Sequence, residues 1–247
     1  MSFTGNTILI TGGTSGIGRA LAEALQQKGN TVIIAGRRKN LLDEVTKANP
    51  GMHGVELNMD DAADIARVAQ QLTRDFPALN AVINNAGIMK PEDVKKGEVA
   101  TAEAVITTNL LGPIRLTAAL MPHLLKQPKA TIFTVSSGLA FVPLAAFPTY
   151  NATKAAIHSY SMSLRYQLQD TNIKVREIIP PWVATELMGS VPNDPRAMPL
   201  EDFIRETVQL MDADSDEITV QRVLPLRNAP KGDEYGFFKT FNASAPH

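Results

Sequence analysis

The chain has 247 residues and no cysteine, and its 24 Lys+Arg nearly balance its 25 Asp+Glu. This length fits one large α/β domain, and 44% apolar residues suffice for a sizeable core. The balanced charge excludes the electrostatic footprint of a nucleic-acid-binding or membrane-surface protein, and the lack of cysteine excludes disulfides and thiolate sites. The four histidines show no metal-ligand spacing, the N-terminus has no basic-then-apolar leader, and no apolar run approaches the roughly 20 residues of a membrane span. We therefore expect a cytoplasmic protein without a metal.

Short apolar segments alternate with helical patterns along the chain. The expected strands are residues 6–11, 31–36, 54–57, 81–87, 130–137 and 173–181, and the expected helices are 18–28, 41–48, 61–76, 101–126 and 150–170. Near-continuous apolar strands separated by helices indicate a parallel sheet covered on both faces. The pattern predicts a Rossmann-like, doubly wound α/β fold of six to seven strands, with ligands at the carboxyl ends of the strands.

The last quarter of the chain is less regular. Proline, asparagine and aspartate in 189–199 indicate a mobile surface loop, 200–211 fits a short helix, and 218–226 fits a seventh strand. We interpret 1–247 as a single dinucleotide-binding and catalytic domain in which 189–212 is a mobile substrate loop and helix.

A glycine-rich turn connects the first expected strand to the first helix, in "ILITGGTSGIGRALAEAL". Glycines permit a tight turn and a close approach of backbone N–H groups to a pyrophosphate, and the helix N-terminus adds partial positive charge. A tight turn without a ligand is the alternative, but the strand before and the helix after are the context that this fingerprint requires. The residues expected to bind a dinucleotide here are Gly12, Thr14, Ser15, Gly16, Ile17 and Gly18.

The end of the second expected strand favours one dinucleotide over the other. An NAD site usually has an acid there for the ribose 2′-hydroxyl, whereas this chain has Gly36 followed by Arg37 and Arg38. Guanidinium groups bind a 2′-phosphate that a carboxylate would repel. The sequence thus favours NADP(H) over NAD(H), with Arg37 the stronger candidate; the alternative is that both arginines are solvated at a helix start.

Tyr150 and Lys154 are four residues apart at the start of an expected helix and therefore lie on one face of it. A nearby cation lowers the pKa of a phenol and makes it a better acid–base group near neutral pH. Alone, this spacing also fits ordinary surface neighbours. Ser136 and Ser137, however, end the fifth expected strand, where a substrate should lie. Asn109, within a helical pattern, fits either a polar task or a harmless surface position.

In combination these segments resemble the single-domain short-chain dehydrogenase/reductase family over roughly residues 5–188. The matching pieces are "TGGTSGIG", "NNAG", Asn109, Ser137 and "YNATK", with "PPWVAT" similar to the family's Pro-Gly-x-x-x-Thr loop. The resemblance implies that Tyr150 is the general acid/base, that Lys154 lowers its pKa and binds the nicotinamide ribose, and that Ser137 positions the substrate oxygen. It also implies that Asn109 holds a water that links Lys154 to solvent.

The resemblance extends the expected cofactor site beyond the glycine-rich turn. The further residues are Asn58, Met59, Asn85, Ala86, Gly87, Tyr150, Lys154, Pro180, Val183 and Thr185. Two positions depart from the family pattern: Pro181 replaces a glycine and removes one N–H, and Asn58 replaces a common aspartate near the adenine. The C-terminal part is similar to a bacterial subgroup, the DltE-like oxidoreductases.

The expected activity is hydride transfer between NADP(H) and the carbonyl or alcohol group of a small molecule. Mostly apolar residues after Ser137 and around Trp182 indicate an apolar or mixed substrate. A homodimer or homotetramer is expected, with no nucleic-acid or membrane partner. The alternatives are a nucleotide-binding regulator or redox sensor with incidental turnover and, more weakly, a hydrolase with Ser137 as nucleophile, which lacks the G-x-S-x-G elbow.

Overall fold

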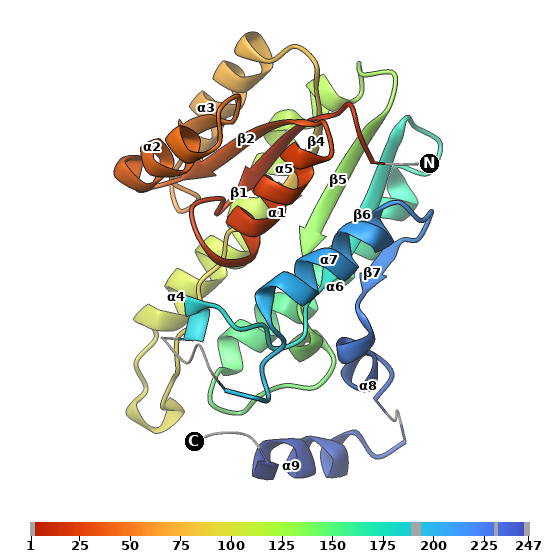
Figure 1. Ribbon diagram of the computed structural model, residues 1–247. Coiled ribbons are helices and arrows are strands. Elements are labelled where there is room, and N and C mark those ends of the chain that lie inside the picture. Colours follow the sequence, from red (N-terminus) through yellow and green to blue (C-terminus); the bar gives the residue numbers. More distant parts are fainter. Residues whose placement is uncertain (1–2, 189–193, 230–231, 245–247) are drawn as a thin grey trace.

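The computed structural model describes residues 3–188, 194–229 and 232–244, and a seven-stranded parallel sheet forms its centre (Figure 1). The strand order is β3-β2-β1-β4-β5-β6-β7. Successive strands are therefore added on one side of β1 up to β3 and on its other side from β4 onward. The strands are β1 (Thr7–Thr11), β2 (Thr31–Gly36), β3 (His53–Glu56), β4 (Leu79–Asn84), β5 (Ala130–Val135), β6 (Ile173–Ile179) and β7 (Glu217–Thr219). The predicted doubly wound fold is confirmed, and a ligand crevice is expected between β1 and β4, where the strand order reverses.

Helices cover both faces of the sheet. Side chains of α1 (Gly16–Gln27), α2 (Lys39–Ala48) and α7 (Leu200–Met211) share one core cluster with Ile8, Ile34 and Ile178. Side chains of α3 (Ala62–Asp75), α5 (Gly112–Leu124) and α6 (Pro148–Gln167) share the other with Leu9, Ile33 and Val175. Neighbouring residues of each strand thus point to opposite cores, which explains why the strands are apolar almost throughout.

The predicted helix 101–126 is divided. The chain forms α4 (Ala100–Ile106), a π-helical turn (Thr107–Leu111) and then α5. Pro113 has no N–H to donate to the carbonyl of Asn109 four residues earlier, so the regular ladder is interrupted at this point. Isolated π turns inside helices are common at functional sites, and this one contains Asn109.

The C-terminal part differs most from its prediction. The strand predicted at 218–226 is confirmed only at its start, because β7 ends at Thr219 and is followed by a 3-10 turn and α8 (Leu224–Arg227). Pro225 fits the first turn of a helix and not the interior of a sheet. A further helix, α9 (Glu234–Ser244), which the pattern does not predict, lies apart from the sheet near the C-terminus (Figure 1).

The segment predicted as a mobile substrate loop and helix lies partly outside the described residues, which omit 189–193. Its helical part, α7, packs against α1 with Phe203 and Met211 buried. Arg176 of β6 fastens the end of α7, since its guanidinium donates to the backbone carbonyls of Leu210, Met211, Ala213 and Ser215.

The helical run Ala100–Leu124 meets the length and composition of a membrane span, contrary to the expectation that no segment approaches one. It is 44% buried inside the structure, where α5 packs on α3 and on the sheet. Core helices of soluble proteins pass the same test, so the run carries no argument for a membrane location.

Candidate active site

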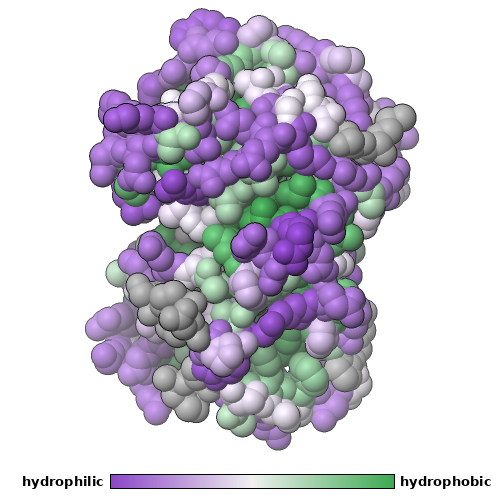
Figure 2. Space-filling model, viewed as in Figure 1, coloured by the Kyte–Doolittle hydropathy of each residue, from purple (hydrophilic) through white to green (hydrophobic). Residues whose placement is uncertain are grey.

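A cleft of about 770 Å³ opens at the carboxyl ends of the strands, where the crevice is expected. It extends from the glycine-rich turn and the end of β2 to the first turn of α6, the loop after β6 and the C-terminal helices. Figure 2 shows hydrophobic residues within a hollow across the middle of the molecule, between largely hydrophilic parts. The cleft is therefore large enough for a dinucleotide together with a small substrate.

The glycine-rich turn is held against the ends of two neighbouring strands. Gly12 has a φ of 68° and donates from its backbone N–H to the carbonyl of Ala35 at 2.8 Å. The Thr11 hydroxyl accepts from the backbone N–H groups of Asn85 and Ala86, each at 3.0 Å. A Cβ on Gly18 would lie 2.3 Å from the carbonyl oxygen of Gly12, so only glycine permits this packing. These contacts account for the predicted tight turn, whereas the approach of a pyrophosphate to it stays a prediction.

The two arginines after β2 both line the cleft, but they are held differently. Arg37 pairs with Asp60 at 3.1 Å, and Asp60 also accepts from the Thr108 hydroxyl. Arg38 reaches back to the Thr14 hydroxyl at 3.4 Å, over the glycine-rich turn. Both arginines therefore lie at the β2 end of the cleft, and their contact with a dinucleotide stays a prediction.

Ser137, Tyr150 and Lys154 meet inside the cleft. Ser137 follows β5, and the other two occupy the first turns of α6, which Pro148 begins. All three are buried, and the Lys154 Nζ lies 5.5 Å from the centre of the Tyr150 ring. Lys154 also donates to the Val135 carbonyl at 2.7 Å, which fixes the end of its side chain.

Burial shifts the pKa of both titratable groups. It raises the pKa of Tyr150 to about 12, against a lowering by the hydrogen bond with Ser137. It lowers the pKa of Lys154 to about 8, against a raising by the charge of Glu177. The direction at Tyr150 is opposite to the predicted lowering, because removal of the phenolate from water outweighs other effects. At neutral pH this Tyr150 is a protonated phenol beside a largely charged amine.

Ser137 and Ser136 differ in their surroundings, although both are buried and line the cleft. The Ser137 hydroxyl accepts from the backbone N–H of Leu139 and hydrogen-bonds with Tyr150. The Ser136 hydroxyl has no partner among the described residues. Of the two serines, Ser137 is the one that interacts with Tyr150; its contact with a substrate stays a prediction.

Asn109 lies behind the cleft instead of lining it. Its side chain is bound to the backbone of Ile88 at both ends, with Oδ1 accepting at 2.8 Å and Nδ2 donating at 2.9 Å. It also donates to the Thr153 hydroxyl at 3.4 Å, one residue before Lys154. The alternative of a harmless surface position is wrong, because the residue is 2% exposed; its predicted water-holding role stays a prediction.

The remaining predicted cofactor residues fall into two groups. Those that line the cleft are Thr14, Ser15, Gly16, Ile17, Met59, Gly87, Pro180, Val183 and Thr185. Asn58 is not among the lining residues, and its side-chain oxygen accepts from the N–H of Asp60 within the same turn. Its contact with an adenine stays a prediction.

Sequence reasoning missed the side chains that enclose the substrate end of the cleft. Leu226 of α8 and Phe241 and Ser244 of α9 line it, although they are more than 70 residues from Tyr150 in the chain. Phe241 also packs on a cluster that contains Tyr150 and Leu144. The sequence of α8 and α9 gives no signal of which surface of the protein these helices cover.

Comparison with known proteins identifies the family. A family model described as short chain dehydrogenase matches residues 6–196. The chain belongs to this family. An uncharacterized oxidoreductase, DltE, of Bacillus subtilis (strain 168) is 40% identical over 248 residues, which cover 98% of each chain. Another, SSP0419 of Staphylococcus saprophyticus, is 30% identical over 73% of this chain and 80% of its own length. This short-chain dehydrogenase is thus of the DltE-like group, and it is an oxidoreductase.

Solved structures of other short-chain dehydrogenases share the fold. One from Burkholderia cenocepacia J2315, in complex with NADP, has a TM-score of 0.85 and 23% identity over 100% of both chains. Another, from Burkholderia phymatum in complex with NAD, has a TM-score of 0.82 and 19% identity over 92% of this chain and 93% of its own. Neighbours of this fold bind either dinucleotide, so the fold alone does not distinguish the two.

Proposed function

We propose that this short-chain dehydrogenase is an NADP(H)-dependent reductase of a carbonyl group, with Tyr150 as general acid. The observation that carries the proposal is the placement of Ser137, Tyr150 and Lys154, all buried, in one cleft with the glycine-rich turn. A dinucleotide fits the residues present, because the cleft of about 770 Å³ is lined at one end by Gly12, Gly16 and Gly18, which have no side chains to fill it.

The chemistry divides between the cofactor and the chain. A bound nicotinamide dinucleotide would supply the hydride. Ser137 orients the substrate oxygen toward Tyr150, whose phenol donates its proton to that oxygen as negative charge develops there. Lys154 then stabilises the resulting phenolate with its charge. A phenol with a pKa of about 12 holds its proton throughout the neutral range, so Tyr150 is in the form that donates to a carbonyl oxygen.

The substrate end of the cleft fits a small molecule with an apolar body. Its walls are largely apolar side chains, and the polar groups converge near Tyr150. The lining apolar residues are Ile88, Met89, Leu139, Leu144, Trp182, Leu187, Leu226 and Phe241. A nucleotide-binding regulator is not favoured, because nucleotide sensing alone does not require three reactive side chains buried beside the nucleotide site.

The test of this function is a panel of aldehydes and ketones with graded apolar substituents, followed by loss of NADPH absorbance. Turnover of at least one class is expected, and binding of NADPH without reduction of any carbonyl would contradict the proposal. The preference for NADPH is tested separately with Arg37→Asp and Arg38→Asp. Each is expected to weaken NADPH binding far more than NADH binding, since only NADPH has the 2′-phosphate; equal weakening would refute the assignment.

Assembly as a homodimer or homotetramer and a cytoplasmic location belong to the same proposal. Helix α6 has small and polar residues that fit close packing against another helix, and Met162 and Tyr166 on it are exposed in the single chain. Light scattering coupled to size exclusion measures the assembly, and a strictly monomeric mass would contradict it.

A further inference from the structure

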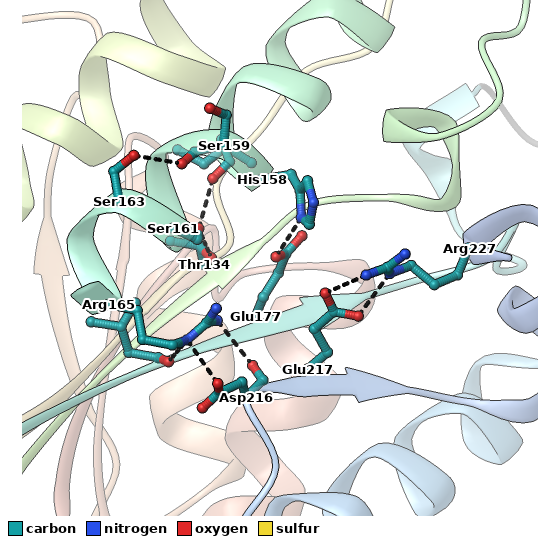
Figure 3. Close-up of polar contacts among 12 residues, drawn as sticks. Thr134, His158, Ser159, Ser161, Ser163, Arg165, Glu177, Asp216, Glu217 and Arg227 are labelled. Atoms are coloured by element: carbon teal, nitrogen blue, oxygen red, sulfur yellow. Dashed lines mark hydrogen bonds and ion pairs between the residues drawn. The ribbon is translucent and has the colours of Figure 1, made fainter. Parts of the chain in front are cut away.

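A second group of ionisable side chains joins α6, β6, β7 and α8, and it consists of His158, Glu177, Glu217 and Arg227 (Figure 3). His158 is one helical turn beyond Lys154, as Lys154 is one turn beyond Tyr150. The His158 Nδ1 lies 2.8 Å from the Oε2 of Glu177 on β6. Tyr150, Lys154 and His158 thus lie in a row along one face of α6, and His158, the last of them, contacts the buried carboxylate of Glu177.

Glu177 is an unusual residue for its position. It lies in β6 between Arg176 and Ile178, and its side chain is completely buried. Its Oε1 has no hydrogen-bond partner among the described residues. A buried carboxylate is costly unless positive charge compensates it, so the charges that surround Glu177 decide why it is tolerated.

The neighbouring strand brings a second carboxylate close to Glu177. Glu217 of β7 is paired in register with it, and one oxygen of each and the His158 ring nitrogen all lie within 4.8 Å of one another. Glu217 is already neutralised, because Arg227 of α8 donates to both of its oxygens at 2.7 and 2.8 Å. The same pairing argues against a metal ion here, since the cation would lie close to the positive charge of Arg227.

The other charged groups near this cluster are also paired. Arg165 of α6 interacts with Asp216 at 3.4 Å at the solvent-exposed edge. The hydroxyl of Thr134, on β5, hydrogen-bonds with the hydroxyl of Ser161, on α6.

Glu177 itself has a hydrogen bond with His158, whose Nδ1 carries a hydrogen when it faces an ionised carboxylate. The charge of Glu177 raises the pKa of two cations, Arg227 and Lys154. Arg227 already pairs with Glu217, whereas Lys154 has no carboxylate partner of its own among the described residues. Lys154 lies close to Glu177 because it donates to the carbonyl of Val135 on β5, which is paired with Ile178, the neighbour of Glu177 on β6.

We propose that Glu177, oriented by His158, is a positioning residue that acts through Lys154: its buried carboxylate is the counter-charge that keeps Lys154 an ammonium inside the cleft. Burial lowers the pKa of Lys154 and so disfavours its ammonium form, and a charge at this depth is only weakly screened by solvent. The role of Lys154 beside Tyr150 rests on the proposed function, whereas the charge state of Lys154 does not. The Glu177–His158 pair thus extends the site beyond the residues that touch substrate.

The test measures the protonation of Lys154 directly and then through turnover. Trace acetylation with acetic anhydride as a function of pH, quantified by peptide mass spectrometry, gives the midpoint at which Lys154 becomes reactive. In Glu177→Gln and Glu177→Met, both of which remove the charge, the midpoint is expected to fall by about one pH unit. Glu177→Asp, which keeps the charge, is expected to restore most of it. Two charge-removing variants are used so that misfolding of one leaves the other.

The matched control is the double variant Glu217→Gln, Arg227→Gln, which removes a neutral pair from the same cluster and is expected to leave the midpoint in place. Unchanged midpoints in both Glu177 variants would overturn the proposal, as would an equal shift in the control. The alkaline limb of carbonyl reduction should move in parallel with acetylation. An acetylation shift in a protein that reduces no carbonyl would support the role of Glu177 and contradict the proposed function.

Discussion

Gly18→Ala gives a sharp test of the dinucleotide site, because the structure sets the size of the disturbance. The new Cβ would lie 2.3 Å from the carbonyl oxygen of Gly12 and 2.9 Å from its carbon, both backbone atoms that cannot rotate away. Restoring even a 3.0 Å contact moves the Gly12 backbone by about 0.7 Å, in an interior that resists such displacement. Overpacking of this kind costs about 1–3 kcal/mol.

The pyrophosphate of the dinucleotide is expected to bind against this displaced turn. We therefore expect NADPH affinity to fall at least tenfold, about 1.4 kcal/mol, and the melting temperature to fall by about 2–4 °C for each kcal/mol. Nucleotide fluorescence titration and thermal unfolding measure the two effects. Gly54→Ala is the control, because its Cβ meets only side chains of α2, at 3.3 Å or more. A folded Gly18→Ala protein with affinity within twofold of the unaltered chain would refute the reasoning.

Three further outcomes follow from the geometry. Tyr150→Phe is expected to lower the rate constant for reduction by about 10²–10⁴-fold with nucleotide affinity nearly intact, and full activity would exclude acid catalysis by this phenol. Because the pKa of Lys154 is about 8 and that of Tyr150 about 12, kcat/KM for reduction should be flat at neutral pH and fall above about pH 8 as the amine loses its proton; activity that rises through pH 10 would contradict this. Arg176→Met leaves four carbonyls without their donor and should destabilise the protein by about 2–4 kcal/mol, measured by denaturant unfolding, whereas Lys174→Met at an exposed pair should cost less than about 1 kcal/mol; equal costs would show that Arg176 does not anchor α7.

The local sequence patterns predict the sheet and the glycine-rich turn well, because both depend on interactions between residues that are close together in the chain. Runs such as "TVIIAG" have no polar face, so they fit only a strand buried on both sides. Gly12 and Gly18 lie between such a strand and a helix, where the tight turn leaves no space for a side chain. The meeting of Ser137 with Tyr150 follows from the same logic, since each is placed by the end of its own element.

Long-range packing accounts for what was missed. Pro113 carries a local signal for the break before α5, but the π turn itself depends on how Asn109 is bound to Ile88. Glu177 directly follows Arg176 in a strand that also contains Lys174, so the sequence does not show that its carboxylate is buried. Nothing in the sequence specifies that the partner is His158, because only the packing of α6 on β6 brings the two together.

Helix α9 lines the substrate end of the cleft but lies outside the part of the chain that carries Ser137, Tyr150 and Lys154. Its side chains form one end of the cleft, yet it lies beyond residue 196, where the match to the family model ends. It buries none of its own residues and is attached through Asn242, which bonds to the backbone of Pro143 and Ala145. Exchange of the C-terminal segment between relatives would change the walls of the substrate site and leave Ser137, Tyr150 and Lys154 in place. For the same reason, an affinity tag for purification is better placed at the N-terminus.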